Sequence, residues 1–352
     1  MPGTVDLYNT RTMLEMLENR KPVRTFILDT FFNRPERTFN TEAVDIDIIK
    51  GRRRLAPFVN PKRQGKLVEK RGYISRTFKP AYVKPKMVTT IDEIFKRHPG
   101  SFIYAPNSGP AIMAAQEMGR NFAELDEMIT RREEWMAVQG LLTGEIPVKG
   151  EGVDVVLGFH MEATHLPVLT GGDLWSAPTT ATPLDDLKTW KRIVAKDSGI
   201  SPSIAIFGLG AIDAFMKCEQ IIGTTGGVKG MFDIRRINIG QIDPQLLPNG
   251  VTYYGTLTEL GLDIYTYEEW YVDDVDEVEY ALIPSNKVLL GNPAARCEKL
   301  YGAIMDLGAT APVPRFPKTW EENDPSERIV MLQSAPLPAP LEIDAFLCAE
   351  VL

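Results

Sequence analysis

Two glycine-rich stretches have spacings close to those of nucleotide-binding loops. GLGAID (208–213) lies between an apolar run and a helical pattern, but Asp213 stands where a dinucleotide-binding loop has its third glycine. In GTTGGVKG (223–230), Val228 replaces the glycine before the lysine, and Gly230 replaces the Ser or Thr that binds magnesium. In nucleotide-binding loops, the glycines missing here let the backbone approach the phosphate groups. In GLGAID the carboxylate of Asp213 would also repel the phosphate groups of a dinucleotide. GLGAID is interpreted as a strand-to-helix turn and GTTGGVKG as a flexible loop, so no cofactor is predicted.

Histidines and cysteines are the next candidates for chemistry, as metal ligands or nucleophiles. His160 and His165 flank Glu162, but a spacing of five in a strand-to-loop segment does not direct both imidazoles to one face. No Ser-His-Asp or Cys-His pairing follows from the spacing. We predict no catalytic residue and no metal site. The cysteines are odd in number and far apart, which fits a reducing compartment without disulfides: Cys218, Cys297 and Cys348.

Charge is the feature that departs from an ordinary globular chain. Residues 48–86 contain thirteen Lys or Arg and one acidic residue, Glu69, whereas the 352-residue chain has a net charge of −8. This stretch therefore carries +12, and the other residues sum to −20. A nucleic-acid-binding tract is one interpretation, and it predicts tight, salt-sensitive binding of DNA by the isolated protein. Contact with an acidic surface of another copy is the other interpretation.

An acidic run lies at residues 268–279. It lacks the glycine and the ligand spacing of a calcium-binding loop. We interpret it either as a solvated acidic edge or as a docking face for basic segments of another subunit. Its members are Glu268, Glu269, Asp273, Asp274, Asp276, Glu277 and Glu279.

The apolar pattern indicates which elements carry these charges. Apolar residues make up 44% of the chain and charged residues 24%, as in soluble globular proteins, and no run is long enough to span a membrane. The first 21 residues lack the apolar segment of a secretory signal. Residues 1–45 are predicted to form an arm with a short helix at 10–19. Its apolar side chains, Phe31 and Phe32 among them, need a covering surface from their own domain or from a neighbour.

Residues 48–86 are predicted to form a long two-stranded excursion with its tip near 60–66. Asn60 and Pro61 supply turn chemistry at that tip, and the stretch has too few large apolar residues to form a core of its own. A helix is excluded, and a central strand is disfavoured, by four prolines: Pro57, Pro61, Pro80 and Pro85.

The clearest helix is predicted over residues 110–139. Ser108 can cap its start, Pro110 suits its first turn and Gly140 can end it. About 30 residues at roughly 1.5 Å each give a rod of about 45 Å, which indicates a spine. The other predicted elements complete an α+β chain: strands within 145–159, 251–290 and 328–352, a buried strand at 203–207, and helices at 183–195 and 211–221.

Three blocks of sequence resemble the lambda-type major capsid proteins of tailed phages, the major capsid protein E family. They are VNPKRQGKLVEKRGYISRTFKPAYVKPK (59–86), KVLLGNPAARCEKLYGAIMD (287–306) and RFPKTWEENDPSERIVMLQSAPLPAPLEIDAFLCAEVL (315–352). Between them the long helix, VDVVLGF, GGDLWS and TPLDDLKTW follow in the same order as in that family. The resemblance therefore spans nearly the whole chain, and composition and periodicity alone do not supply it.

The resemblance implies an α+β fold of the Hong Kong 97 capsid type. That fold has an N-terminal arm, an extended hairpin called the E-loop, a spine helix with a peripheral β-sheet, and an axial domain that points to the capsomer centre. The last strands, at 328–352, are expected to rejoin the peripheral sheet. On this sequence the expected parts are an arm at 1–45, an E-loop hairpin at 46–95, a peripheral domain at 96–198 and 305–352 with the spine helix at 110–139, and an axial domain at 199–304.

The resemblance also implies a structural protein without enzymatic activity. It is expected to form pentamers and hexamers of an icosahedral virion head around double-stranded DNA, assembled in the host cytoplasm and without a membrane. The expected partners are a separate scaffolding protein, a portal protein, a decoration protein and, by weak non-specific contact, the packaged DNA. A covalent cross-link through Lys62 or Lys66 is disfavoured, because lambda-type shells resemble those that use a decoration protein. A related nanocompartment shell that encloses enzyme cargo is the alternative.

The separation of charge predicts which surfaces meet between copies. A strongly basic lining would hold DNA that must slide during packaging, whereas acidic subunits avoid that grip. The E-loop is then expected to lie on an acidic neighbour. Candidate contact residues are Arg52, Arg53, Arg54, Phe58, Lys62, Arg63, Lys66, Lys70, Arg71, Phe78, Phe31 and Phe32. Candidate acidic partners are Glu124, Glu127, Glu133, Glu134, Glu268, Glu269, Asp273 and Asp274.

Overall fold

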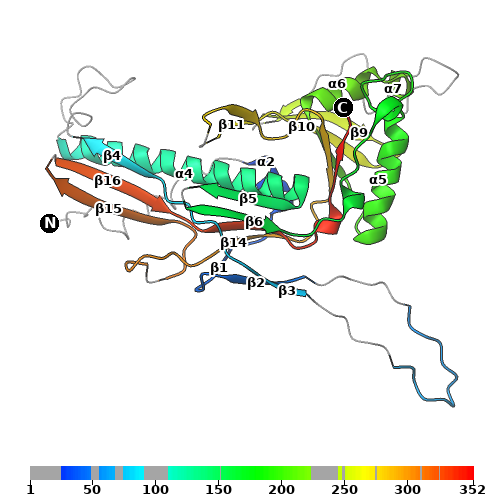
Figure 1. Ribbon diagram of the computed structural model, residues 1–352, viewed down its shortest axis with the longest axis horizontal. Helices are drawn as coiled ribbons and strands as arrows, with labels where there is room; N and C mark the ends of the chain where they lie inside the picture. The colour runs from blue at the N-terminus through cyan, green and yellow to red at the C-terminus, as the bar shows by residue number, and fades with distance from the viewer. Residues whose placement is uncertain are drawn as a thin grey trace.

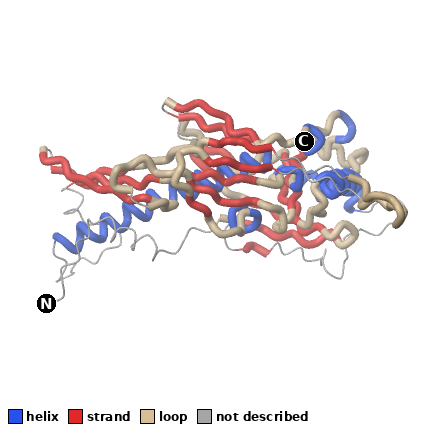
Figure 2. The backbone as a smooth tube through the Cα atoms, turned by 90° about the horizontal axis from the view of Figure 1, so that it is seen from below, coloured by secondary structure: helices blue, strands red, loops and turns tan. Residues whose placement is uncertain are grey.

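Helix α4 (Pro110–Thr143) is the longest element and runs along the long axis of the molecule (Figure 1). Viewed from below, most strands also follow that axis, and several of the other helices lie together at one end (Figure 2). The helix predicted at 10–19 lies outside the described residues. The computed structural model describes residues 25–48, 55–67, 74–90, 110–150, 152–222, 245–247, 250–273, 276–309, 311–324 and 326–352.

Helix α4 confirms the predicted spine but ends one turn later than its sequence pattern predicts. Gly140 continues the helix and packs close to Ile146, because a Cβ at 140 would lie 3.5 Å from Ile146 Cγ1. The end comes at Gly144, whose φ of +73° favours glycine. A Cβ at 144 would also clash with Met161. The glycine that ends α4 is therefore Gly144, which corrects the expected boundary.

Two three-stranded sheets accompany α4. The antiparallel sheet in the order β15-β16-β4 comprises β4 (Lys86–Thr90), β15 (Phe316–Asn323) and β16 (Ser326–Gln333). The sheet in the order β1-β14-β17 comprises β1 (Arg37–Thr38), β14 (Cys297–Tyr301) and β17 (Pro336–Pro340). One face of α4 is buried with two β16 residues in a single cluster: Met118, Phe122, Leu125, Ile129, Val330 and Leu332.

A six-stranded sheet and three helices form the core at the other end. The strand order is β18-β13-β7-β10-β9-β8. The completely buried Trp175 stacks on Trp190 of α5, with ring centroids 6.0 Å apart, and contacts Phe207 of β7. The bounds are β7 (Ile204–Phe207), β8 (Gln245–Leu247), β9 (Val251–Leu257), β10 (Leu262–Tyr267), β13 (Lys287–Gly291), β18 (Leu347–Glu350), α5 (Pro183–Asp197), α6 (Leu209–Lys217) and α7 (Glu219–Ile222).

Two expectations for this region are corrected. The helix predicted at 211–221 is two helices, because Cys218 adopts an extended backbone with ψ of 136° between α6 and α7. The last strand, β18, pairs with β13 of the six-stranded sheet, whereas β16 and β17 belong to the two sheets beside α4. Leu347 packs in one core cluster and Cys348 in the other, so both faces of β18 are buried. Burial on both faces explains its continuous apolar sequence.

The remaining elements in the described ranges are three hairpins and several short helices. No described helix combines the length and the apolar content that a membrane span requires. The hairpins are β2 (Val44–Ile48) with β3 (Ile74–Phe78), β5 (Glu145–Gly150) with β6 (Val153–Gly158), and β11 (Trp270–Val272) with β12 (Glu279–Ala281). The short helices are α2 (Phe26–Phe31) and three 3-10 turns, Ala163–His165, Gly171–Asp173 and Ile343–Ala345.

One phenylalanine of the predicted E-loop hairpin is buried and another is exposed, which gives a matched test. Phe78 is 6% exposed, whereas Phe58 is fully exposed. Phe78→Ala is expected to lower the free energy of unfolding of the unassembled subunit by about 3–5 kcal/mol, because it leaves a cavity. Phe58→Ala should change it by less than about 0.5 kcal/mol. Urea denaturation followed by circular dichroism measures both, and equal losses would contradict the buried position of Phe78.

Candidate assembly surfaces

The β2–β3 hairpin is fixed to the body of the protein at its base. Val44 pairs directly with Phe78 across the two strands, and both side chains are buried. The ring of Phe78 stacks on Phe159, with centroids 5.3 Å apart, in a cluster that includes Met136 of α4. Phe78 was a candidate for contact with a neighbour, but it belongs to the core of its own chain. The packed base sets the direction in which the hairpin leaves the body.

The tip segment, residues 55–67, lies far from the body at the lower right of Figure 1. It reverses at Asn60, whose carbonyl accepts the Arg63 N–H at 2.9 Å and whose Oδ1 accepts the Lys62 N–H at 3.0 Å. Asn followed by Pro favours this turn, since the Asn side chain bonds the backbone two residues on and Pro fixes φ. The predicted turn near 60–66 is confirmed.

Side chains of the tip segment extend into solvent. Large apolar side chains gathered on one short exposed segment are typical of an interaction surface. The almost completely exposed apolar residues are Leu55, Phe58 and Leu67. The basic residues are also exposed, and they form no ion pair with another described residue: Lys62, Arg63 and Lys66. The other predicted contact residues, and one predicted partner, lie outside the described residues: Arg52, Arg53, Arg54, Lys70, Arg71 and Asp274.

The described part of the arm packs on its own domain. Phe31 and Phe32 are buried, and the Phe31 ring meets the edge of Phe346 with centroids 5.2 Å apart. Both rings lie in the cluster that covers the last turns of α4. They were candidates for contact with a neighbour, and that expectation is corrected because the chain's own core surrounds them.

Glu134 of α4 holds this arm in place. Its carboxylate accepts the N–H groups of Ile27 at 2.8 Å and of Leu28 at 3.0 Å, and it also accepts a hydrogen bond from the Tyr267 hydroxyl. Burial raises the pKa of the Glu134 carboxyl to about 7, against these three hydrogen bonds, which favour the charged form. Glu134 therefore links the arm, α4 and β10 within one chain. The expectation that it contacts a basic segment of a neighbouring copy is corrected.

Glu133 is also occupied within the chain. Its two carboxylate oxygens accept hydrogen bonds from Arg315 Nη1 at 2.7 Å and Nη2 at 2.8 Å, and Asp126 accepts one from Arg315 Nε at 3.0 Å. Such a bidentate, buried pair costs several kcal/mol to break, of order 3–5 kcal/mol. Glu133 is therefore corrected from a docking residue to a structural one. On the same helix, Glu127 pairs with Arg131 at 3.6 Å, and Glu124 is exposed.

The described residues of the predicted acidic run, 268–273 and 276–281, form two paired strands, and we call the whole segment 268–281 the acidic hairpin. Its turn is fixed by Asp276, which accepts the Val278 N–H at 3.1 Å and the Tyr280 hydroxyl at 2.8 Å. Glu268 is exposed, whereas Glu269 and Asp273 are half-buried. These three predicted partners therefore lie together on one surface element.

The glycines of GLGAID serve internal packing. A Cβ at Gly208 would clash with the carbonyl of Pro284, and the Ala211 N–H donates to the Ser285 carbonyl at 2.8 Å. The start of α6 is thus closed by the chain's own backbone, which agrees with the prediction of a connecting turn.

GTTGGVKG lies outside the described residues. The ring of the buried His165 is held within the chain, with Nδ1 2.7 Å from the Phe346 carbonyl oxygen and Nε2 3.2 Å from Asp197 Oδ2. Among the described residues, no cluster of His, Cys, Asp or Glu is arranged to hold a metal.

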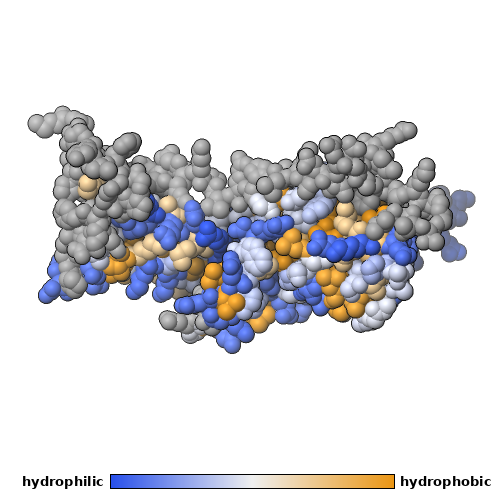
Figure 3. Space-filling model, turned by 90° about the horizontal axis from the view of Figure 1, so that it is seen from above, coloured by the Kyte–Doolittle hydropathy of each residue, from blue (hydrophilic) through white to orange (hydrophobic). Residues whose placement is uncertain are grey.

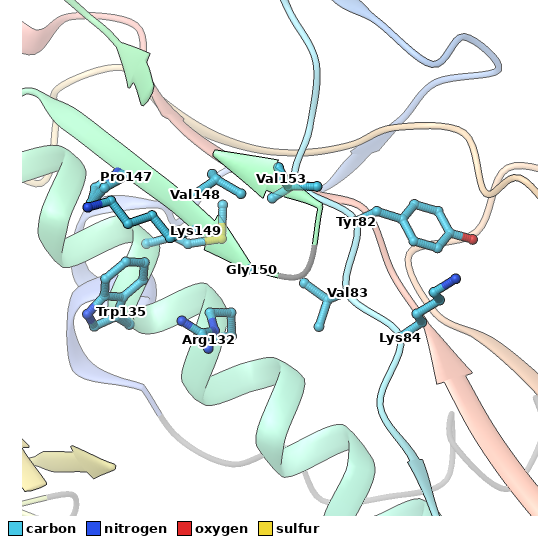
Figure 4. A pocket seen from close by; sticks show the side chains of 12 residues that line it. Tyr82, Val83, Lys84, Arg132, Trp135, Pro147, Val148, Lys149, Gly150 and Val153 are labelled. Atoms are coloured by element: carbon cyan, nitrogen blue, oxygen red, sulfur yellow. The ribbon is translucent and has the colours of Figure 1, made fainter. Parts of the chain in front are cut away.

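A groove of about 240 Å³ lies between α4, the β5–β6 hairpin and residues 81–84. Figure 4 shows Arg132 and Trp135 on α4, with Val148 and Lys149 on β5 beside them. The Arg132 guanidinium lies 5.2 Å from the Trp135 ring centroid. The described lining is apolar and basic and contains no carboxylate, imidazole or thiol. It therefore offers a positively charged hollow without an acid–base pair.

Comparison with known proteins gives the family. The sequence matches the family model described as phage major capsid protein E over residues 9–351. The chain belongs to the phage major capsid protein E family. This result confirms the resemblance carried by the three sequence blocks, and the protein is a phage major capsid protein.

Relatives of the capsid protein match it from end to end. The major capsid protein of Enterobacteria phage P21 is 28% identical over 358 residues, covering 98% of this chain and 99% of that protein. The major capsid protein of Escherichia phage lambda is 27% identical over 359 residues, covering 99% of this chain and 100% of that protein. These matches leave no large segment of either relative without a counterpart in the capsid protein.

Solved structures share the fold of the capsid protein. A prophage protein of Escherichia coli CFT073, described as a capsid protein, has a TM-score of 0.71 at 21% identity and covers 98% of this chain and 99% of its own. A phage-related protein of Bordetella bronchiseptica RB50 has a TM-score of 0.54 at 13% identity and covers 97% of this chain and 96% of its own. The capsid protein thus has the predicted α+β capsid fold of the Hong Kong 97 type.

The buried Glu134 gives the capsid protein a predictable pH dependence. Between pH 4.5 and about 7 the folded chain binds more protons at this carboxyl than the unfolded chain, because burial raises its pKa from 4.5 to about 7. The free energy of unfolding is therefore expected to fall as the pH rises through this window, by roughly 3 kcal/mol. Glu134→Gln should remove this fall, measured by urea denaturation of the unassembled subunit at pH 5, 6 and 7.

The matched control is Glu124→Gln, which changes an exposed carboxyl on the same helix and should keep the dependence of the unmodified chain. Identical pH profiles for Glu134→Gln and the unmodified capsid protein would contradict the assignment to Glu134.

Proposed function

We propose that the capsid protein assembles into pentamers and hexamers of an icosahedral head, with residues 46–95 acting as an E-loop that joins neighbouring copies. The observation that carries this proposal is the tip segment, in which Leu55, Phe58 and Leu67 are exposed while Phe78 at the base is buried. A segment with a packed base and uncovered apolar side chains suits contact with a second copy, where those side chains lose contact with water.

The charge distribution supports the same contact. Residues 48–86 carry +12 in a chain whose other residues sum to −20. Single exposed ion pairs contribute only about 0 to 1 kcal/mol. A strip of like charges that meets an opposite strip nevertheless speeds association and sets its register. The same charges leave the rest of the surface acidic, which keeps contact with packaged DNA weak and non-specific.

Family membership supports the finer assignments. We place the axial domain at 199–304 and the peripheral domain at 96–198 and 305–352, with the arm at 1–45, so that β18 reaches from the peripheral domain to pair with β13 of the axial domain. The role is structural rather than enzymatic, and assembly takes place in the host cytoplasm. Its partners are a separate scaffolding protein, a portal protein, and a decoration protein that binds the outer surface.

Assembly is the direct test of this proposal. Purified capsid protein, alone or co-expressed with a scaffolding protein, is expected to form rings or closed shells in electron micrographs and to elute ahead of a 39.3 kDa monomer. Reversing Arg52, Arg53 and Arg54 to Glu should leave a soluble subunit that forms no shells, because the charge of the basic strip falls from +12 to +6 and the three new carboxylates are repelled by the acidic neighbour. A lone monomer that never assembles, even with a scaffold, would overturn the proposed function.

DNA binding separates this proposal from a nucleic-acid-binding tract. The soluble subunit is expected to bind duplex DNA no more tightly than non-specific contacts allow, with a Kd of roughly 10⁻⁴ to 10⁻⁶ M at physiological salt. Fluorescence anisotropy with a labelled duplex measures this, and the Arg52, Arg53 and Arg54 variant is the matched comparison. Nanomolar binding by the soluble subunit that the triple variant loses would favour the DNA-binding interpretation instead.

A further inference from the structure

We propose that the acidic hairpin of one capsid protein receives the tip segment of a second copy. The inference rests on the proposed function, since it names the surface on which the E-loop lies. The family match does not say which surface of a neighbouring copy the tip segment contacts, and the inference names that surface.

The acidic hairpin has one uncovered apolar face. Trp270 pairs with Ala281, and Val272 pairs with Glu279, so the four side chains point to the same side of the two strands. Trp270 is 50% exposed and Val272 64% exposed. An exposed tryptophan beside an exposed valine is an anchoring surface that an apolar side chain can cover.

The opposite face of the acidic hairpin is fixed to the body. The Tyr271 ring meets the edge of Trp135 on α4, with centroids 6.2 Å apart, and lies 5.9 Å from the Tyr280 ring. The Leu282 N–H also donates to the Glu269 carbonyl at 2.8 Å. The hairpin is therefore held in one orientation, with Trp270 and Val272 turned toward solvent before any partner arrives.

The two segments have opposite and unmixed charge. The acidic hairpin contains seven Asp or Glu and no Lys or Arg, whereas the tip segment contains three Lys or Arg and no Asp or Glu. Both segments intersperse their charges with exposed apolar side chains. Attraction between the charges and burial of the apolar side chains therefore act together at one contact.

The two segments lie on opposite edges of the molecule. In Figure 1 the tip segment is at the lower edge and β11 is at the upper edge, with α4 between them. A view from above shows hydrophobic residues, in orange, beside hydrophilic ones, in blue, on the uncovered part of that upper side (Figure 3). A chain therefore does not cover its acidic hairpin with its own tip segment, and a second copy is the occupant.

Other surfaces of the chain suit the tip segment less well. The groove beside α4 is lined by Lys84, Arg132 and Lys149, so it repels a basic segment. Two of the α4 carboxylates, Glu133 and Glu134, are engaged inside their own chain. The acidic hairpin is the described surface that combines negative charge with uncovered aromatic and aliphatic side chains.

Photo-cross-linking in assembled particles tests this contact. The probe is p-benzoylphenylalanine placed at position 58, and in a second variant at position 67, with particles assembled from a mixture of unlabelled and ¹⁵N-labelled chains. Mass spectrometry is expected to find cross-links from both positions to residues 268–281 of the other isotopic form. The matched control carries the probe in place of Leu307, which is equally exposed, and should give no cross-link to that segment.

The outcomes separate this inference from the proposed function. Particles that form normally but cross-link positions 58 and 67 only to other segments would overturn the contact and leave the capsid role intact. Cross-links within a single isotopic form only would overturn the requirement for a second copy. If the unmodified chain forms no multimer at all, both the contact and the proposed function fail.

Charge reversal gives an independent measurement. Reversing Lys62, Lys66 and Arg63 to Glu is expected to lower the yield of particles about tenfold or more, because opposite strips become like-charged. Reversing four carboxylates of the acidic hairpin, which changes its charge from −7 to +1, should do the same: Glu268→Lys, Glu269→Lys, Glu277→Lys and Glu279→Lys. A chain with both sets should regain a yield within about threefold of the unmodified protein. A combined variant no better than the weaker single set would overturn the contact.

Discussion

Helix α4 buries side chains over nearly its whole length, and the positions of the surrounding parts depend on that burial. Its stretch from Met118 to Ile129 packs on β16, Met136 packs with the base of the β2–β3 hairpin, and its last turns share a cluster with the arm and the six-stranded sheet. Two polar links supplement the apolar contacts, Glu133 with Arg315 and Glu134 with the arm. Because all of these contacts lie on one rod, a change in its direction would displace the base of the β2–β3 hairpin and the core of the six-stranded sheet together.

Sequence patterns predicted the elements whose stability is local. The amphipathic repeat located α4 and α5, and Asn60 with Pro61 located the tip, because turn chemistry and side-chain period operate within a few residues. The end of α4 was missed because the choice of Gly144 depends on Met161. The break at Cys218 was missed for a similar reason, since the next N–H, that of Glu219, donates to the distant Pro178 carbonyl.

The candidate surfaces were predicted only in part. Charge density located both the tip segment and the acidic hairpin, because runs of like charge are visible in a sequence. Whether one particular side chain is free depends on partners far along the chain. Glu133 and Glu124 are both carboxylates on a predicted helix and cannot be told apart by sequence. In the structure Glu133 accepts hydrogen bonds from Arg315, 182 residues away, whereas Glu124 is exposed. Phe31 and Phe58 look alike as apolar residues of extended segments, yet one is buried and one is not.

The tip segment and the acidic hairpin lie at opposite edges of the chain, which has a consequence for the order of assembly. The contact that we propose joins two unlike surfaces and is therefore directional, so an open row of copies joined by it always ends in one unfilled hairpin and one unfilled tip, whatever its length. Closing the row into a ring fills both ends at once, and the last contact forms at high effective concentration because its partners are already joined. Incomplete rows are then short-lived, and a pool of subunits consists mainly of single chains and finished rings.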